Sequence, residues 1–141
     1  MTAKEYLHQA YRLDQRINSD IKELHRLREM STSISSPTEK DKVQTSQNTD
    51  APFVKWVFKI HELEEKIDAE IHLLVELKEE LRNVIQTVEN TDEQMVLRYR
   101  YIHNMTWEEI ADQLYVDART ARRWHGAGLK NVKLPINPVK I

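Results

Sequence analysis

The apolar residues of the first third of the chain recur in steps of three and four, which is the spacing of one helix face. A helix should begin where Thr2 and Glu5 form an S/T-x-x-E capping box, and it should run to about Met30. Its stripe consists of Ala3, Tyr6, Ala10, Leu13, Ile17, Leu24 and Leu27, with Asp20 at a position where an apolar residue is expected. The first segment, residues 1–30, is therefore predicted to be one long arm helix.

A second and longer stripe follows Asp50 and Pro52, two residues typical of a helix start. It comprises Phe53, Trp56, Ile60, Leu63, Ile67, Leu74, Leu77, Leu81, Val84 and Val88, and Glu70 alone interrupts it. The stripe covers about five heptads, enough for a coiled coil over residues 52–90. The two helices are expected to pair as an antiparallel hairpin. The apolar surface left over favours a homodimer through this arm.

The two acids within the stripes occupy similar places. The segment Ile17–Leu24 aligns weakly with Ile67–Leu74, and in both an acid precedes an isoleucine. Shared heptad spacing explains this as well as an internal duplication does. If Asp20 and Glu70 lie in the seam, they fix register or orientation; the other interpretation is that each points to solvent at the edge of its stripe.

Residues 31–51 are rich in Ser, Thr, Gln, Asn and Lys, with Pro37 among them, and they are predicted to form a flexible polar linker. The short run Val43–Ser46 has two interpretations, a docking segment or plain solvated linker, and its polarity favours the second.

The last third of the chain predicts a helix-turn-helix within residues 91–134, followed by a tail at 135–141. A capping box at Thr91–Gln94 opens one helix, and Thr106 with Glu109 opens the next. Ile110, Ala111 and Leu114 form the inward face of the latter helix. The turn is Leu114–Val116. Asp117 then caps a second helix that should run to Leu129, with Ala121 and Trp124 facing inward.

The outward face of that second helix is small and basic. Arginine guanidinium groups donate paired hydrogen bonds to guanine edges or phosphates, and small residues permit close approach. The candidate DNA-binding residues are Ala118, Arg119, Thr120, Arg122, Arg123, His125, Lys130 and Lys133. Arg119, Arg122 and Arg123 are the choices for direct contacts, with Thr120 on the backbone. His125 has three interpretations: a phosphate contact, a cap at the end of the helix, or a surface histidine without a role. The alternative for the whole face is a solvated basic surface on a small helical hairpin.

From Thr91 to Val132 the chain resembles region four of bacterial sigma factors, which recognises the −35 promoter element. The matching pieces are Val96–Tyr101, Thr106–Ala111 and Val116–Ala121. Val43–Ser46, the long acidic helix and the ending Trp124–Leu129 extend the resemblance to small Gram-positive phage proteins of the ArpU/RinA type, which implies activation of late phage genes.

The chain departs from the sigma pattern at the turn and inside the second helix. Tyr115 stands where Gly is usual, and a positive φ at a non-glycine residue costs about 1 kcal/mol. Asp117 still caps the helix but adds negative charge where phosphates would lie. Ala121 replaces a usual Val. These departures affect base preference more than the fold.

The composition supports an all-α protein without catalytic chemistry. Two glycines and four prolines among 141 residues leave little material for hairpins. The chain has no cysteine, no signal-peptide pattern, no run of membrane length, no Gly-rich phosphate loop and no close metal spacing among its six histidines. We therefore expect a cytoplasmic protein that is not an enzyme and needs no cofactor. The net charge is −2, yet from Tyr115 onward six basic residues face one acidic residue.

The sequence thus favours a phage or prophage regulator that binds specific double-stranded DNA at promoters through its C-terminal helix-turn-helix. One alternative is an adaptor that binds RNA polymerase or another protein and has weak DNA affinity. A further alternative is a DNA-packaging recognition subunit, which also combines a helix-turn-helix with a coiled coil.

Overall fold

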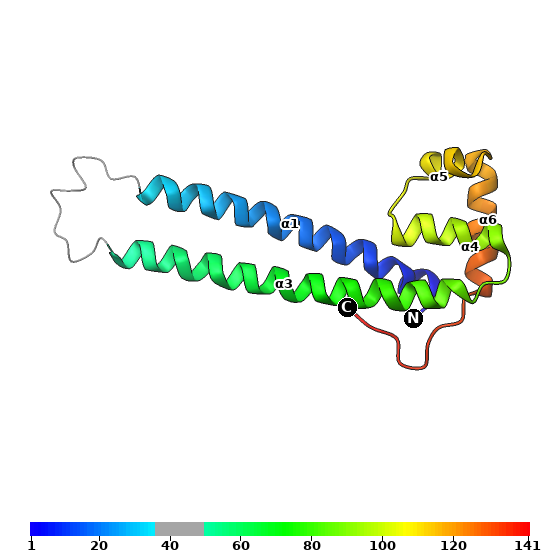
Figure 1. Cartoon of the computed structure of the whole chain (residues 1–141), viewed down its shortest axis with the longest axis horizontal. Coiled ribbons are helices and arrows are strands. Elements are labelled where there is room, and N and C mark those ends of the chain that lie inside the picture. The colour runs from blue at the N-terminus through cyan, green and yellow to red at the C-terminus, as the bar shows by residue number, and fades with distance from the viewer. Residues whose placement is uncertain (36–49) are drawn as a thin grey trace. The chain divides into compact units, whose positions relative to one another are not determined.

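The structure, a computed structural model, describes residues 1–35 and 50–141, and the regular secondary structure of this part consists of helices, with no strand (Figure 1). The elements are α1 (Ala3–Ser35), α3 (Asp50–Gln86), α4 (Thr91–Leu97), the π-helix η1 (Arg98–Ile102), α5 (Trp107–Leu114) and α6 (Ala118–Asn131). The predicted all-α class, a long helical hairpin followed by a helix-turn-helix, is confirmed.

The two long helices begin where the sequence predicts. The Thr2 N–H donates to Glu5 Oε2 at 2.9 Å, and the Glu5 N–H donates to Thr2 Oγ1 at 3.2 Å, which is the reciprocal capping box. Pro52 lies in the first turn of α3, where its missing N–H costs nothing. The predicted end of the first helix near Met30 is wrong, because α1 continues to Ser35. The rest of the predicted linker, including Val43–Ser46, lies outside the described residues.

The chain divides into two compact units, and both long helices contribute to each of them. Unit 2 comprises Gln15–His72 and pairs the later part of α1 with the earlier part of α3 in antiparallel fashion (Figure 1). Ile17, Leu24 and Ile67 are buried between the two helices, as their stripes predict. An ion pair at 3.3 Å joins Arg28 to Glu64.

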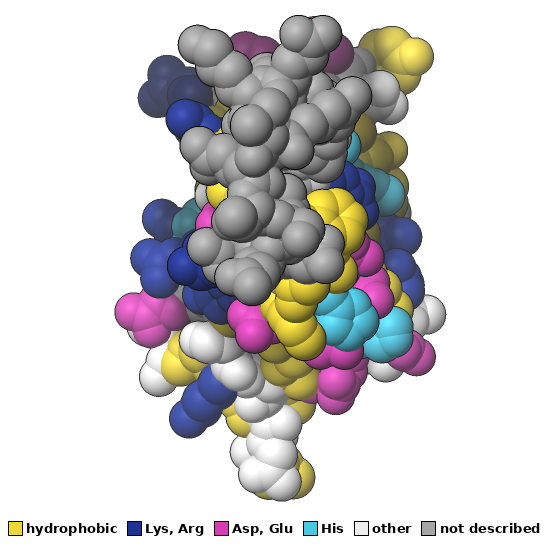
Figure 2. Space-filling model, turned by 90° about the vertical axis from the view of Figure 1, so that its left-hand side faces the viewer, with side chains coloured by type: hydrophobic (Ala, Val, Ile, Leu, Met, Phe, Trp, Pro, Cys, Tyr) yellow, Lys and Arg dark blue, Asp and Glu magenta, His cyan; other side chains and the backbone are white. Residues whose placement is uncertain are grey.

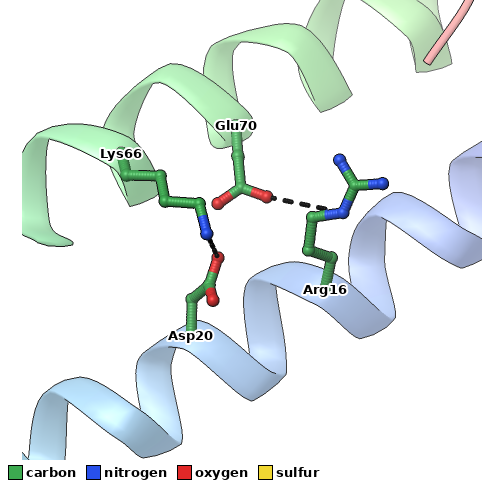
Figure 3. Close-up of polar contacts among 4 residues, drawn as sticks. All are labelled: Arg16, Asp20, Lys66 and Glu70. Carbon is green, nitrogen blue, oxygen red and sulfur yellow. Dashed lines mark ion pairs between the residues drawn. The ribbon is translucent and has the colours of Figure 1, made fainter.

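The seam of unit 2 also holds two carboxylates (Figure 3). Asp20 is 7% exposed and Glu70 is 8% exposed, so the interpretation that they point to solvent is wrong. Lys66 Nζ lies 3.5 Å from Asp20 Oδ2, and Arg16 Nε lies 4.0 Å from Glu70 Oε2. Burial raises the pKa of Glu70, and so does the neighbouring Asp20 carboxylate, which can accept a hydrogen bond only from protonated Glu70 and repels its charged form. The charges of Lys66 and Arg16 oppose the rise.

Unit 1 comprises Met1–Asp14 and Leu73–Ile141 and contains two hydrophobic clusters. The larger cluster joins the first turns of α1 to the last turns of α3 and to the chain that follows. Its buried members are Tyr6, Leu7, Ala10, Leu77, Leu81, Val84, Ile85, Val88, Leu97, Tyr101 and Ile102. The start of α1 is therefore part of the same core as the helix-turn-helix region, whereas the sequence predicted that region as a separate domain at 91–134.

The C-terminal segment packs back against α1 and α3. The side-chain amide of Gln9 donates to the Val139 carbonyl at 2.9 Å and accepts from the Ile141 N–H at 3.0 Å. Glu80 Oε1 accepts the Val139 N–H at 3.1 Å and also accepts the Tyr6 hydroxyl. The predicted tail 135–141 is thus held by hydrogen bonds within unit 1.

Candidate nucleic-acid interface

The smaller cluster of unit 1 forms the core of the helix-turn-helix. Val96, Ile110 and Ala121 are fully buried, and Leu114, Val116 and Trp124 are among the partly buried side chains packed against them. The inward positions predicted for α5 and α6 are confirmed. Because this core is small, Ala121 at the centre of the crossing leaves room for the larger side chains around it.

The turn between the two helices adopts the left-handed conformation that the sequence indicates. Thr106 caps α5 by accepting the Glu109 N–H at 3.2 Å. At the other end of α5, Tyr115 has φ 57° and ψ 42°, and its N–H bonds to the Ala111 carbonyl. The Tyr115 side chain is 96% exposed, so no packing offsets this strain within the chain.

Asp117 fixes the start of α6. Its Oδ1 accepts the Thr120 N–H at 2.7 Å, which confirms the predicted N-cap. Hydrogen bonds from the Thr120 hydroxyl and N–H, together with the charges of Arg119 and Arg123, lower the pKa of Asp117. The carboxylate therefore stays ionised, and its charge remains at the end of α6 that would face DNA.

The outer face of α6 carries the predicted basic side chains. Arg119, Arg122 and Arg123 are exposed, and Ala118 and Thr120 are half-buried. None of the ion pairs within the described residues involves an α6 arginine. Lys130 at the end of α6 and Lys133 beyond it are also exposed. The guanidinium groups are therefore available for an anionic partner.

Two glycines of α6 lie in opposite surroundings. A Cβ added at exposed Gly126 would meet nothing within 4 Å. A Cβ at Gly128 would lie 3.1 Å from Leu97 Cδ1 and 3.3 Å from Glu93 Cβ, both on α4. Gly128 thus lets α6 cross closely over α4, and the Asn131 amide donates to Glu93 Oε2 at 3.0 Å beside the crossing.

His125 lies in the interior, so its prediction as a surface histidine is wrong. The side chain is 8% exposed, and its Nε2 is 2.6 Å from the Tyr101 hydroxyl oxygen. Trp107 packs edge-on to the imidazole at 4.8 Å. Burial, followed by the charges of Lys4 and Arg100, lowers the pKa of His125 to about 4. We therefore omit His125 from the proposed DNA contacts and assign it to the packing of α6.

Two local features escaped the sequence pattern. The chain between α4 and α5 forms a π-helix, Arg98–Ile102, and then a positive φ of 55° at Asn104. The helix α4 is capped by Asn90, whose Oδ1 accepts the Glu93 N–H at 3.1 Å, and not by the predicted Thr91. Asparagine caps as well as threonine does and precedes it by one residue, so the motif alone favoured the wrong residue.

The described residues show no group of three or more potential ligands that could hold a metal ion. No helix among them is long and apolar enough to cross a membrane. What the outer face of α6 presents is a set of forked cationic donors on a helix that packs against α4 and α5.

The fold and this face define a class, the all-α proteins in which a long helical hairpin precedes a helix-turn-helix. The chain belongs to the family described as "Protein of unknown function (DUF1492)", whose profile matches residues 32–132, more than half of the chain. No curated protein and no solved structure matches it.

Proposed function

We propose that this protein is a sequence-specific double-stranded DNA-binding regulator of transcription, encoded by a phage or prophage and acting at promoters. The observation that carries the proposal is the exposed face of α6, whose arginines form no ion pair within the described residues, on a helix that packs against α4 and α5. In a helix-turn-helix, the second helix enters the major groove and its first residues contact base edges. Arg119, Arg122 and Arg123 occupy the first two turns of α6. Phage origin rests on the resemblance to ArpU/RinA-type proteins.

The contacts divide by type. Arg119, Arg122 and Arg123 are assigned to base edges or to phosphates beside them, Thr120 to the backbone, and Lys130 and Lys133 to phosphates along the flank. The small residues Ala118 and Gly126 would allow α6 to approach the floor of the groove closely. Each good base contact should contribute about 1–3 kcal/mol of discrimination.

The arm supplies the second part of the proposal, a homodimer. Within unit 2, four large hydrophobic side chains near the start of α3 are exposed: Phe53, Val54, Val57 and Phe58. Figure 2 shows hydrophobic side chains gathered on this end of the molecule beside histidine and acidic groups. A second copy would cover them. Sedimentation at micromolar concentration should give a mass twice 16.8 kDa, and Val57→Glu with Phe58→Glu should return the monomer. A monomer in the wild type would refute this part.

The first experiment is to capture sheared phage and host DNA on the purified protein and to sequence the retained fragments. Enrichment of a short site upstream of a few genes supports a promoter regulator, and a palindromic site supports the dimer. Arg122→Ala should then weaken binding and relax preference at one base pair, whereas Arg26→Ala, an equal charge loss in unit 2, should change neither. If Arg122→Ala has no effect, α6 does not lie in the groove as we propose.

One observation favours a second function, binding to RNA polymerase or another protein partner. Tyr115 is 96% exposed at the tip of the turn, and the ionised Asp117 follows it. An exposed tyrosine is a frequent anchor of protein interfaces, and the carboxylate repels phosphate. Under this proposal, purified polymerase is retained by the wild type and lost with Tyr115→Ala, while DNA binding is weak and insensitive to salt.

A further inference from the structure

Besides the arginines of α6, unit 1 carries basic side chains on α1 and on η1. Lys4 and Arg12 are exposed on the first turns of α1 and lie on one helix face, with the half-buried His8 between them. A third cation, Arg100, comes from η1. We refer to Lys4, Arg12 and Arg100 as the arm-base cations.

The arm-base cations have no acidic partner within the described part of the chain. None of its ion pairs includes any of them. The two acids nearest in sequence on α1 are engaged elsewhere, because Glu5 accepts the Thr2 N–H at 2.9 Å and Asp14 accepts the Asn104 amide at 3.4 Å. Within the described residues, the arm-base cations therefore form no ion pair with an acidic side chain.

The charges of Lys4 and Arg100 lower the pKa of two histidines that lie on different helices. Burial lowers the pKa of His8, and so do the charges of Arg12, Arg100 and Lys4. Lys4 and Arg100 also lower the pKa of His125 on α6, and no carboxylate offsets the effect at either histidine. Lys4 and Arg100 thus act on both histidines, whereas Arg12 acts on His8 alone.

Arg100 connects this surface to the start of α5. Its guanidinium lies over the Trp107 ring at 4.5 Å, and its Nη1 donates to the Met105 carbonyl at 2.9 Å. Trp107 is the first residue of α5. In a helix-turn-helix bound to DNA, the first helix crosses the phosphate backbone beside the groove that the second helix enters.

We propose that the arm-base cations bind the phosphate backbone of the DNA flank next to the segment contacted by α6. This inference rests on the proposed DNA-binding function, and it adds a second, sequence-independent contact made by the arm helix. The occupant is DNA because these cations form no ion pair within the described residues and Arg100 joins them to the start of α5. The exposed ring of Tyr11 beside them stacks on His8 at 5.2 Å.

The test compares two double variants with equal charge changes on the same helix. Lys4→Gln/Arg12→Gln removes two of the arm-base cations, both exposed, so the fold should persist. Lys22→Gln/Arg26→Gln removes two exposed cations of α1 within unit 2 and is the matched control. The dissociation constant for a random-sequence DNA duplex is measured by fluorescence anisotropy from low to moderate salt, because phosphate contacts do not depend on sequence.

Each phosphate contact contributes about 0.9 to the slope of log affinity against log salt. The Lys4→Gln/Arg12→Gln variant should therefore lose about 1.8 from the slope of the wild type, whereas the control should keep the wild-type slope. Hydroxyl-radical footprints should shorten on one flank in the first variant only.

An unchanged slope and footprint in Lys4→Gln/Arg12→Gln would overturn the inference, and so would an equal loss in the control. Such a result would leave the proposed function standing, since wild-type binding would remain. If the wild type itself showed no salt-dependent affinity for DNA, the proposed function would fail first. A circular dichroism spectrum and melting temperature equal to those of the wild type exclude misfolding as the cause of a lost slope.

Discussion

The buried carboxylates of unit 2 should lower the stability of the helical arm relative to an apolar seam. Asp20 and Glu70 are each less than a tenth exposed, and Asp20 Oδ2 and both Glu70 oxygens accept no hydrogen bond from a donor group. Their counter-ions, Lys66 and Arg16, are more than half exposed, and the two ion pairs have N–O distances of 3.5 Å and 4.0 Å. Solvent at the basic partner therefore weakens each ion pair. The carboxylates are desolvated without full compensation.

Replacing both acids with leucine tests this directly. Buried ion pairs exchanged for apolar residues of similar volume are often neutral or more stable by about 1–4 kcal/mol. Because Lys66 and Arg16 can remain in solvent, we expect Asp20→Leu/Glu70→Leu to raise the free energy of unfolding by about 1–3 kcal/mol. Urea titration followed by circular dichroism measures the change, and hydrogen exchange of the α1 and α3 amides within unit 2 locates it.

The pH dependence gives an independent check. The pKa of Glu70 is raised in the folded state, so the folded chain holds the Glu70 proton more tightly than the unfolded chain does. Its stabilising effect is present below the unfolded pKa and is lost as pH rises through the folded pKa. Glu70→Gln should remove this part of the pH dependence and leave a more stable arm at neutral pH. The claim that the buried acids lower stability would be refuted if Asp20→Leu/Glu70→Leu and Glu70→Gln were both less stable than the wild type at pH 7.

Three further changes address unit 1. Gly126→Ala should stabilise the protein by about 0.5–1 kcal/mol through helix propensity. Gly128→Ala should gain less or lose stability, because its Cβ meets the fully buried side chain of Leu97. Thermal unfolding compares the two variants. The lowered pKa of His125, about 4, means that stability is present above pH 6.5 and is lost as pH falls toward 4, a loss that His125→Gln should reduce in melting curves. Asp117→Asn keeps the cap but removes its charge, so anisotropy should show tighter DNA binding with unfolding free energy within about 0.5 kcal/mol of the wild type.

The sequence predicted those features that a local pattern determines. The helix stripes follow from side-chain periodicity, and the cap at Asp117 follows from a short polar residue before a helix. The positive φ at Tyr115 followed from the resemblance to the sigma pattern, in which Gly usually holds this position, although tyrosine disfavours it. The burial of His125 could not be predicted from the sequence, because its position on α6 borders the face predicted to point outward. In the interior, its ring nitrogen is satisfied by the hydroxyl of Tyr101, a contact that no local pattern indicates.

Long-range packing accounts for the rest. Gln9 gives no signal in a single sequence, yet it holds Val139 and Ile141 from the other end of the chain. The π-helix Arg98–Ile102 is likewise set by tertiary packing, since it turns Tyr101 and Ile102 into the larger core. Contacts between residues that are far apart in the chain leave no periodic pattern. The boundary between arm and helix-turn-helix was therefore predicted from local signals alone, the end of the apolar stripe and the capping box at Thr91–Gln94.

The larger core of unit 1 implies that the helix-turn-helix is not an independent domain. A fragment of residues 91–141 would expose the side chains of Leu97, Tyr101 and Ile102, which are nearly fully buried in the whole chain. With three large apolar surfaces returned to water, at about 1.5–3 kcal/mol each, the fragment would lose most of the stability of a small domain. It should unfold without cooperativity when heated.

A chain that joins 1–14 to 73–141 through a short Gly/Ser linker keeps both clusters and lacks unit 2. The ion pair between Arg16 and Glu70, which lie two and three residues from these ends, shows that the two ends to be joined are near one another. This shortened chain should melt cooperatively, sediment as a monomer and still bind random-sequence DNA. Cooperative folding of the 91–141 fragment alone, or failure of the shortened chain to fold, would show that the first turns of α1 are not needed where the structure places them.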